Sequence, residues 1–69
     1  MIAREMMRRI EIKHEGQWVE ADMGQVEPGD VFRMFEPGGK PVADSSGHTA
    51  WQAVARPFIS GDWTIEVAQ

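Results

Sequence analysis

The sequence predicts a small all-β (mainly β) domain, built as a five-stranded curled sheet or an SH3-like barrel. Apolar and polar side chains alternate with a period of two, and no window keeps a helical period over three turns. Segments rich in Gly and Pro separate the alternating stretches, as tight turns between strands do. At 69 residues the chain has room for one core, and short strands bury one face best when the sheet curls.

The N-terminal residues differ from the rest of the chain. Met, Arg, Glu and Ala there favour a helix, but so short a helix is marginal without tertiary support. We therefore expect residues 1–8 to form a short helical turn or a disordered lead. Residues 9–69 are predicted to form the single β domain.

The first two strands are predicted to form a hairpin. Residues 9–13 alternate charged and β-branched side chains, and residues 18–23 alternate again after a turn that contains a glycine. Ile10 and Ile12 should face the core, since the other face of their strand is charged. Trp18 then faces solvent, unless a bulge shifts the register of the second strand.

The third strand follows a turn of recognisable type. Pro28 fixes φ at the first central position, and Gly29 supplies the positive φ that a type II turn needs at the second. Residues 31–35 are nearly all apolar, as in a central strand covered on both faces, with Arg33 as the one charged member. The prolines and glycines of residues 36–41 end this strand.

The C-terminal half contains a loop and two further strand candidates. Residues 42–48 are small and polar, which is the composition of a mobile loop. Residues 49–56 form the fourth candidate, although their alanines also suit a short helix, and residues 63–67 alternate most clearly as the last strand. The aromatic side chains predicted to fill the core are Phe32, Phe58 and Trp63.

Three groups of residues resemble chemical sites, and each fails a requirement. Residues 44–48 hold Asp, Ser and His, but adjacent loop positions rarely supply a nucleophile, a base and an orienting group. His14 and His48 lack the short paired spacing of structural zinc ligands. The Gly-Gly-Lys of residues 38–40 lacks the GxxxxGK[ST] pattern and is followed by Pro41. We therefore expect no enzyme activity, no catalytic residue, no metal site and no cofactor.

The amino-acid composition indicates the cellular compartment in which the protein is expected. The chain has no cysteine, which excludes disulfides and thiolate sites and fits a reducing environment. Charged residues interrupt every apolar stretch before the roughly 18 residues that a membrane span requires. The N-terminal stretch has no continuous apolar run of the kind found in secretory signals, so we expect a cytoplasmic protein that does not enter a membrane.

The aromatic residues are more numerous than so small a core needs. Trp18 and Phe35 are predicted on the face away from the core, with Arg33 or Arg56 near them. Exposed aromatic side chains beside arginine are typical of hot spots in protein interfaces. The predicted binding residues are Trp18, Arg33, Phe35 and Arg56.

The charge is distributed unevenly along the chain. Residues 1–13 carry four basic and two acidic side chains, a net charge of +2. The remaining residues therefore carry −6, which gives the whole chain its net charge of −4. This acidic body disfavours nucleic acid as a partner. Clustered carboxylates form a solvated face that protects a sheet edge or, alternatively, a row that mimics a phosphate backbone. The acidic residues concerned are Glu20, Asp22, Glu27, Asp30 and Glu36.

One stretch resembles a known group of proteins. Residues 27–42 read EPGDVFRMFEPGGKPV and are followed by WQAV at residues 51–54 and WTI at residues 63–65. This pattern resembles small uncharacterised phage and prophage proteins with a GD-x-FR-x-F-x-PDG-x-PV stretch. The chain departs from it at Gly38, where Asp is usual, and at residues 56–58, where the group ends in Pro-Tyr. The resemblance implies a phage origin and brings no catalytic residue with it.

These observations predict a non-enzymatic protein-interaction module of phage or prophage origin in the host cytoplasm. It would bind a host or phage protein through an aromatic and acidic face, and a homodimer formed through an edge strand would compensate for the small core. One alternative is a virion or assembly component. The other is a small nucleic-acid-binding barrel with Trp18 as a stacking platform. The cations available to that barrel are Arg4, Arg8, Arg9, Lys13, Arg33 and Arg56.

Overall fold

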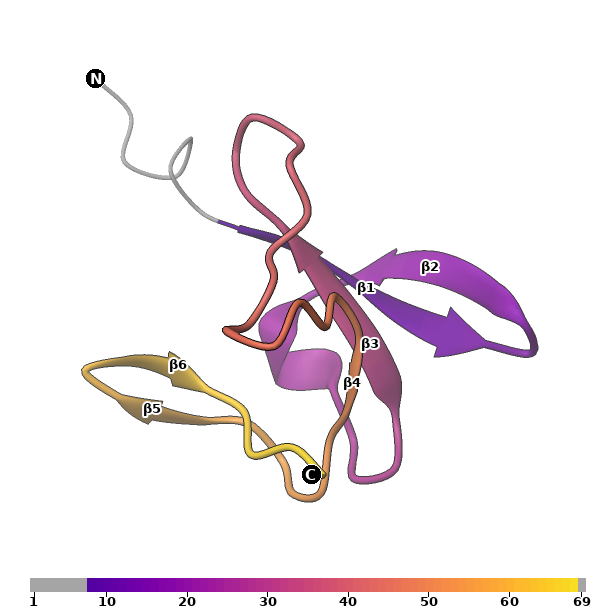
Figure 1. Cartoon of the computed structure of the whole chain (residues 1–69). Coiled ribbons are helices and arrows are strands. Elements are labelled where there is room, and N and C mark those ends of the chain that lie inside the picture. Colours follow the sequence, from indigo (N-terminus) through magenta and orange to yellow (C-terminus); the bar gives the residue numbers. More distant parts are fainter. Residues whose placement is uncertain (1–7, 69) are drawn as a thin grey trace.

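The computed structural model describes residues 8–68 and is mainly β, with an antiparallel four-stranded sheet and a separate two-stranded hairpin (Figure 1). The sheet has the order β2-β1-β3-β4, and β5 pairs with β6. The predicted class is confirmed, but the described strands do not close into a barrel. All but the last residue of the predicted lead, 1–8, lies outside the described residues. The elements are β1 (Arg9–His14), β2 (Gln17–Ala21), the 3-10 helix η2 (Met23–Gln25), β3 (Val31–Phe35), β4 (Trp51–Gln52), β5 (Phe58–Ser60) and β6 (Asp62–Thr64).

The first two strands form the predicted hairpin. Their antiparallel register runs from Ile10 opposite Ala21 to His14 opposite Gln17, without a bulge. The two loop residues both have positive φ, 52° at Glu15 and 83° at Gly16, which is the geometry of a type I′ turn.

The unbroken register decides the orientation of Trp18. It is the cross-strand partner of Lys13, so it shares the charged face of β1. The second possibility, a bulge that would turn Trp18 toward the core, is not realised.

The third strand lies in the middle of the sheet, as predicted. The turn before it is of type II: the Asp30 N–H donates to the Glu27 carbonyl at 3.0 Å, and Gly29 has a φ of 94°. β3 pairs with β1 on one side and with β4 on the other. Only one of its faces is fully covered, since Phe32 is buried whereas Arg33 is half-buried on the opposite face.

The core lies on the other side of the sheet from Trp18. Partly buried side chains from η2, β3, β4 and the C-terminal segment pack against it, and the Phe32 and Trp51 rings are 5.7 Å apart. Val26 is completely buried just after η2, a position that strand periodicity does not single out. The fully buried side chains of the described residues are Ile10, Val26, Phe32 and Ala53.

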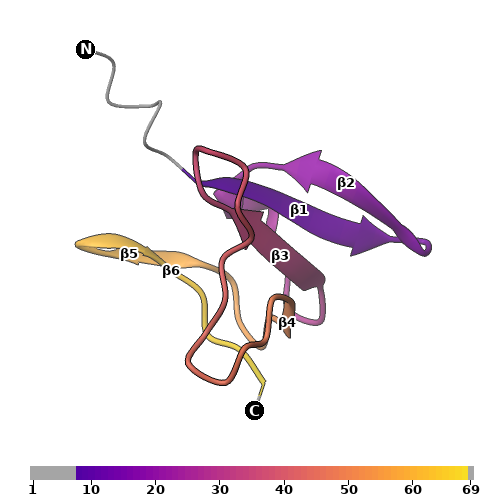
Figure 2. The same ribbon diagram turned by 45° about the horizontal axis from the view of Figure 1, so that its top comes forward.

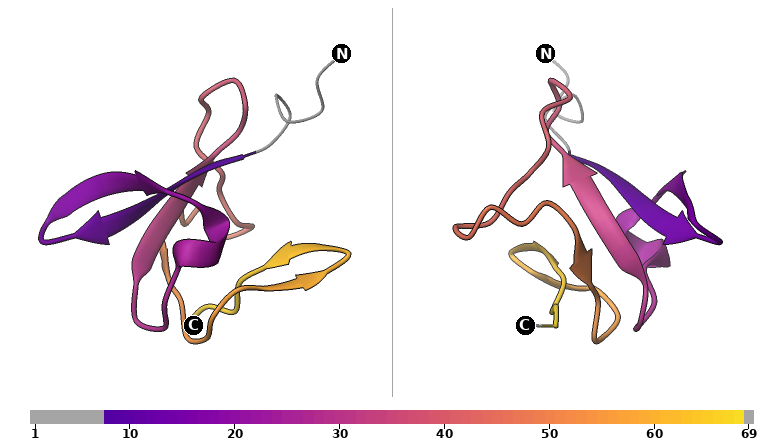
Figure 3. Two further views of the ribbon diagram at one scale, coloured as in Figure 1. Left: turned by 180° about the vertical axis from the view of Figure 1, so that it is seen from behind. Right: turned by 45° about the vertical axis from the view of Figure 1, so that its right-hand side comes forward.

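Two of the three predicted core aromatics lie outside the core. Phe32 is buried as expected, but Phe58 is 43% exposed and Trp63 is 41% exposed. Both belong to the β5–β6 hairpin, which extends from the sheet on the side away from the β1–β2 hairpin (Figures 2 and 3). The prediction was wrong because it assumed that the last strand joins the main sheet.

The two predicted C-terminal strands are shorter than expected. The fourth strand, predicted over 49–56, is reduced to β4, and the last one, predicted over 63–67, ends as a strand at Thr64. The chain then returns to β4, where the Val54 N–H donates to the Glu66 carbonyl and Ala53 forms a bridge with Val67. This return places the C-terminal segment against the core.

Candidate functional site

The most organised set of polar and aromatic side chains lies on the outer face of β2, β1 and β3. In each strand, alternate residues face the core, and the residues between them face outward. Cross-strand pairing then brings Lys13 beside Trp18, Glu11 beside Arg33 and Arg9 beside Phe35. Among these six residues there are four contacts between a cation and an aromatic ring.

Five of these side chains form a continuous series in which cations and rings alternate. The Arg33 guanidinium carbon lies 4.2 Å from the centre of the Trp18 ring and 5.2 Å from that of Phe35. The Lys13 ammonium lies 5.5 Å from the Trp18 ring, and the Arg9 guanidinium 4.8 Å from the Phe35 ring. All four distances are within the range of cation–π attraction. We call the series Lys13, Trp18, Arg33, Phe35 and Arg9 the cation–aromatic ladder.

Glu11 holds the centre of this ladder. Nε and Nη2 of Arg33 lie 2.8 and 2.7 Å from the same Glu11 carboxylate oxygen, and Arg9 Nη2 lies 3.9 Å from the other oxygen. The Glu11 side chain is only 18% exposed, so its attraction for Arg33 is screened less than that of a surface pair. The carboxylate thereby fixes the guanidinium plane beside the two rings.

Three of the four predicted binding residues meet in the ladder. Trp18, Arg33 and Phe35 come from β2 and β3, and Arg33 reaches across β1 to the Trp18 ring. Arg56 does not join them, because it is paired with Glu27 at 3.1 Å beside the type II turn. Both side chains of that pair are more than half exposed, so it is a surface ion pair.

Sequence patterns predict only part of the ladder. They present Arg9 and Lys13 as general cations for nucleic acid, and they do not distinguish Glu11 from other carboxylates. All three lie at alternate positions of a single strand, and that spacing places them on one face. The spacing does not show that β3 lies beside β1 on the side opposite β2.

The acidic residues do not form one row. Glu36 is ion-paired with Arg8 at 3.2 Å, and Glu27 is paired as described above. The Asp30 carboxylate accepts the Glu27 N–H at 2.8 Å and so stabilises the turn. Glu20 lies on the ladder face, opposite Glu11, and Asp22 is the N-cap residue of η2.

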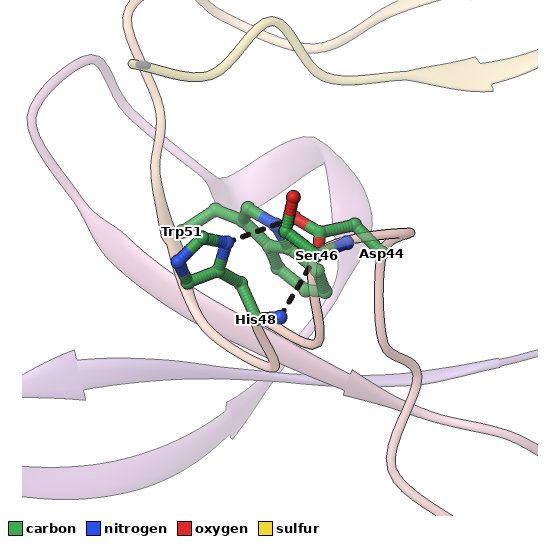
Figure 4. A network of polar contacts seen from close by, with 4 residues as sticks. All are labelled: Asp44, Ser46, His48 and Trp51. Carbon is green, nitrogen blue, oxygen red and sulfur yellow. Dashed lines mark hydrogen bonds and ion pairs between the residues drawn. The ribbon is translucent and has the colours of Figure 1, made fainter.

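The polar loop of residues 42–48 is organised around Asp44 (Figure 4). Its carboxylate accepts the main-chain N–H groups of Ser46 and His48, both at 2.9 Å, and the indole Nε1–H of Trp51 at 3.1 Å. The Trp51 hydrogen bond, followed by that from the His48 N–H, lowers the pKa of Asp44 below its ordinary value of 3.8. The Asp44 carboxylate thus links the loop to the partly buried Trp51 through a hydrogen bond.

The residue types of a nucleophilic triad therefore do not form a triad here. Ser46 contributes its main-chain N–H to Asp44, and His48 contributes both its N–H and an Nδ1 contact of 3.4 Å. All three belong to the same turn, and Gly47 with a φ of 88° completes it. A surface hollow lies beside this loop, with Trp51 and Val67 in its wall.

The two histidines have separate neighbours. His14 lies 3.5 Å from the carboxylate of Glu15 in the hairpin turn, whereas His48 lies beside Asp44. Across residues 8–68, no three His, Cys, Asp or Glu side chains come together in a way that could hold a metal ion. The same part of the chain contains no helix that is long and apolar enough to cross a membrane.

Comparison with known proteins found no matching family model, no matching curated protein and no matching solved structure. The chemistry of the candidate site is therefore inferred from the contacts among its own residues. Those contacts describe a preorganised outer face with two aromatic rings, three cations and a central carboxylate.

Proposed function

We propose that this chain is a non-enzymatic protein-interaction module of phage or prophage origin, which binds a host or phage protein in the host cytoplasm through the cation–aromatic ladder. The observation that carries the proposal is the position of Trp18, Arg33 and Phe35 together on the outer face of the sheet. Trp and Arg are among the residue types that dominate binding energy in protein interfaces.

The contacts that hold the Arg33 side chain support this role. Arg33 is held by Glu11 and lies beside two rings, so its side chain loses little further freedom when a partner covers it. The ladder face also carries both signs of charge, with three cations balanced in part by Glu11 and Glu20. Mixed charges around aromatic anchors suit a protein surface, where complementary polar groups set orientation and specificity.

The phage origin is supported by the resemblance of residues 27–42 to phage and prophage proteins. That stretch contains β3, which supplies Arg33 and Phe35 to the ladder. The absence of cysteine is consistent with the reducing cytoplasm of a host cell.

Single-stranded nucleic acid is the second candidate, because Trp18 lies between the cations Lys13 and Arg33 as in a stacking platform. Two observations rank it second. Of the six basic side chains in the described part of the chain, four are ion-paired with carboxylates, and the whole chain carries a net charge of −4. Binding to a polyanion would require those ion pairs to open or to be shared.

The test is affinity capture from host and phage-infected lysates at low salt, with wild type and a ladder variant compared. We expect wild type to retain a defined protein and Phe35→Ala to lose it. Phe58→Ala is the matched control, because that ring is exposed on the other hairpin, and it should retain the protein. Capture of nothing by wild type, or equal capture by Phe35→Ala, would contradict the proposal. Binding of a single-stranded oligonucleotide at about 50 mM salt would favour the second candidate.

A further inference from the structure

Within residues 8–68, no strand or loop pairs with the outer edge of β2 in the main sheet. β2 is the outermost strand of the order β2-β1-β3-β4 and has five residues. The other edge strands are shorter, with two residues in β4 and three each in β5 and β6. Natural proteins commonly protect an edge with Pro, a bulge or charged side chains; β2 contains no Pro, no Lys and no bulge, and Glu20 is its one charged residue. β2 is therefore the strand best suited to pair with another strand.

The main-chain groups of Trp18 and Glu20 point to this open edge. His14 and Gln17 flank the two-residue turn and form its closing hydrogen-bonded pair. Hydrogen-bonded pairs alternate along an antiparallel ladder, so Gln17 and Val19 bond toward β1, and the residues between them point away. Outside the sheet pairs, no backbone hydrogen bond within residues 8–68 involves Trp18 or Glu20.

We propose that β2 pairs antiparallel with β2 of a second copy of this chain, with Val19 at the two-fold axis. Three symmetric registers use the outward main-chain groups. Centring on Trp18 places Glu20 opposite Gly16, whose φ of 83° is not that of a strand. Centring on Glu20 places two carboxylates opposite each other, which is unfavourable. Centring on Val19 pairs Trp18 with Glu20 of the second copy and forms four backbone hydrogen bonds.

The side chains on the inner side of this edge fit the Val19 register. Val19 is 48% exposed, and in this register it packs against Val19 of the second copy. Apolar area is thereby buried in both chains at the symmetry axis. The small core of the single chain makes a partner subunit useful for stability.

The charges on the outer side also fit. Within one chain, Glu20 lies opposite Glu11, and the Glu11 carboxylate is already engaged by Arg33. In the dimer, Glu20 lies beside Trp18 of the second copy, over whose ring the Lys13 ammonium is held. The dimer therefore offers Glu20 a cation and joins the two ladders into one continuous face. A five-residue strand pair buries less than the standard interface of about 800 Å² per partner, so the dimer is expected to be weak.

The test is analytical ultracentrifugation of the full chain over a wide concentration range. We expect a concentration-dependent dimer in wild type, with a Kd on the order of 10 to 500 µM. Val19→Lys sets two ammonium groups against each other, and Glu20→Pro removes an N–H that faces only the open edge. Each should weaken dimerisation at least about tenfold, while circular dichroism shows that the monomer remains folded.

Ile59→Lys is the matched control, because Ile59 is 69% exposed on the separate β5–β6 hairpin. It should leave the dimer unchanged. A strict monomer at all concentrations, persistence of the dimer in both β2 variants, or loss of the dimer in Ile59→Lys would each overturn the proposal. Phe35→Ala should abolish partner capture without affecting the dimer, so failure of this inference is distinguishable from failure of the proposed function.

Discussion

Replacing Arg33 with alanine should destabilise the fold although Arg33 lies outside the core. The side chain makes a part-buried ion pair with Glu11, worth about 0.5 to 1 kcal/mol once screening by solvent is allowed for. Its contacts with the Trp18 and Phe35 rings contribute about 0.5 to 1 kcal/mol each. The sum is about 2 kcal/mol, which is a large share of the roughly 3 to 5 kcal/mol expected for a domain of this size.

Urea unfolding followed by circular dichroism measures this change in free energy without screening the ion pair, and thermal unfolding measures the Tm. A loss of about 2 kcal/mol corresponds to a decrease in Tm of about 8 to 16 °C for a domain of this length. Arg56→Ala is the control, because its ion pair with Glu27 is exposed on both sides and should change stability by less than about 0.5 kcal/mol. If Arg33→Ala and Arg56→Ala have the same small effect, the ladder is not the preorganised unit described above.

Three further predictions concern the loop, a turn and the core. Because folding lowers the pKa of Asp44, the ionised carboxylate contributes fully to loop stability above pH 3.8, and this contribution is lost as the pH falls through the pKa of the folded state. The NMR resonance of the Trp51 indole N–H should shift in that acidic range in wild type and not in Asp44→Asn. Gly29→Ala should cost about 1 kcal/mol in chemical denaturation, since Gly29 has a φ of 94°, and an unchanged midpoint would contradict the turn assignment. Phe32→Ala removes a buried ring and should cost about 3 to 5 kcal/mol, enough to abolish the folded NMR spectrum, whereas Phe58→Ala should cost less than about 1 kcal/mol, and similar effects from both would contradict the location of the core.

The N-terminal half of the fold follows closely from local sequence patterns. Alternation over residues 9–13 predicted the inward positions of Ile10 and Ile12, and both side chains contribute to the core. The Pro28 and Gly29 pair predicted a type II turn, which the φ of Gly29 and the turn hydrogen bond confirm. These predictions succeeded because periodicity and turn chemistry act over a few residues.

The C-terminal half was predicted less well. Trp63 alternates with Ile65 and Val67 in the sequence, so all three were expected on one buried strand. In the structure, Trp63 pairs with Ile59 in a separate hairpin, whereas Ile65 and Val67 pack against the core. Alternation shows that a segment is extended, but it does not show which other segment pairs with it.

The candidate site shows the same division. The sequence alone determined that Trp18 and Glu20 alternate with Val19 and that Arg33 is the one charged residue of its strand, but it left open a bulge that would turn Trp18 toward the core. Only the tertiary structure placed Arg33 beside Trp18, since that contact requires β1 to lie between β2 and β3. It also decided that Arg56 belongs to a different surface. Non-local strand pairing depends on the packing of the whole core, and for that reason no local pattern in the sequence could specify it.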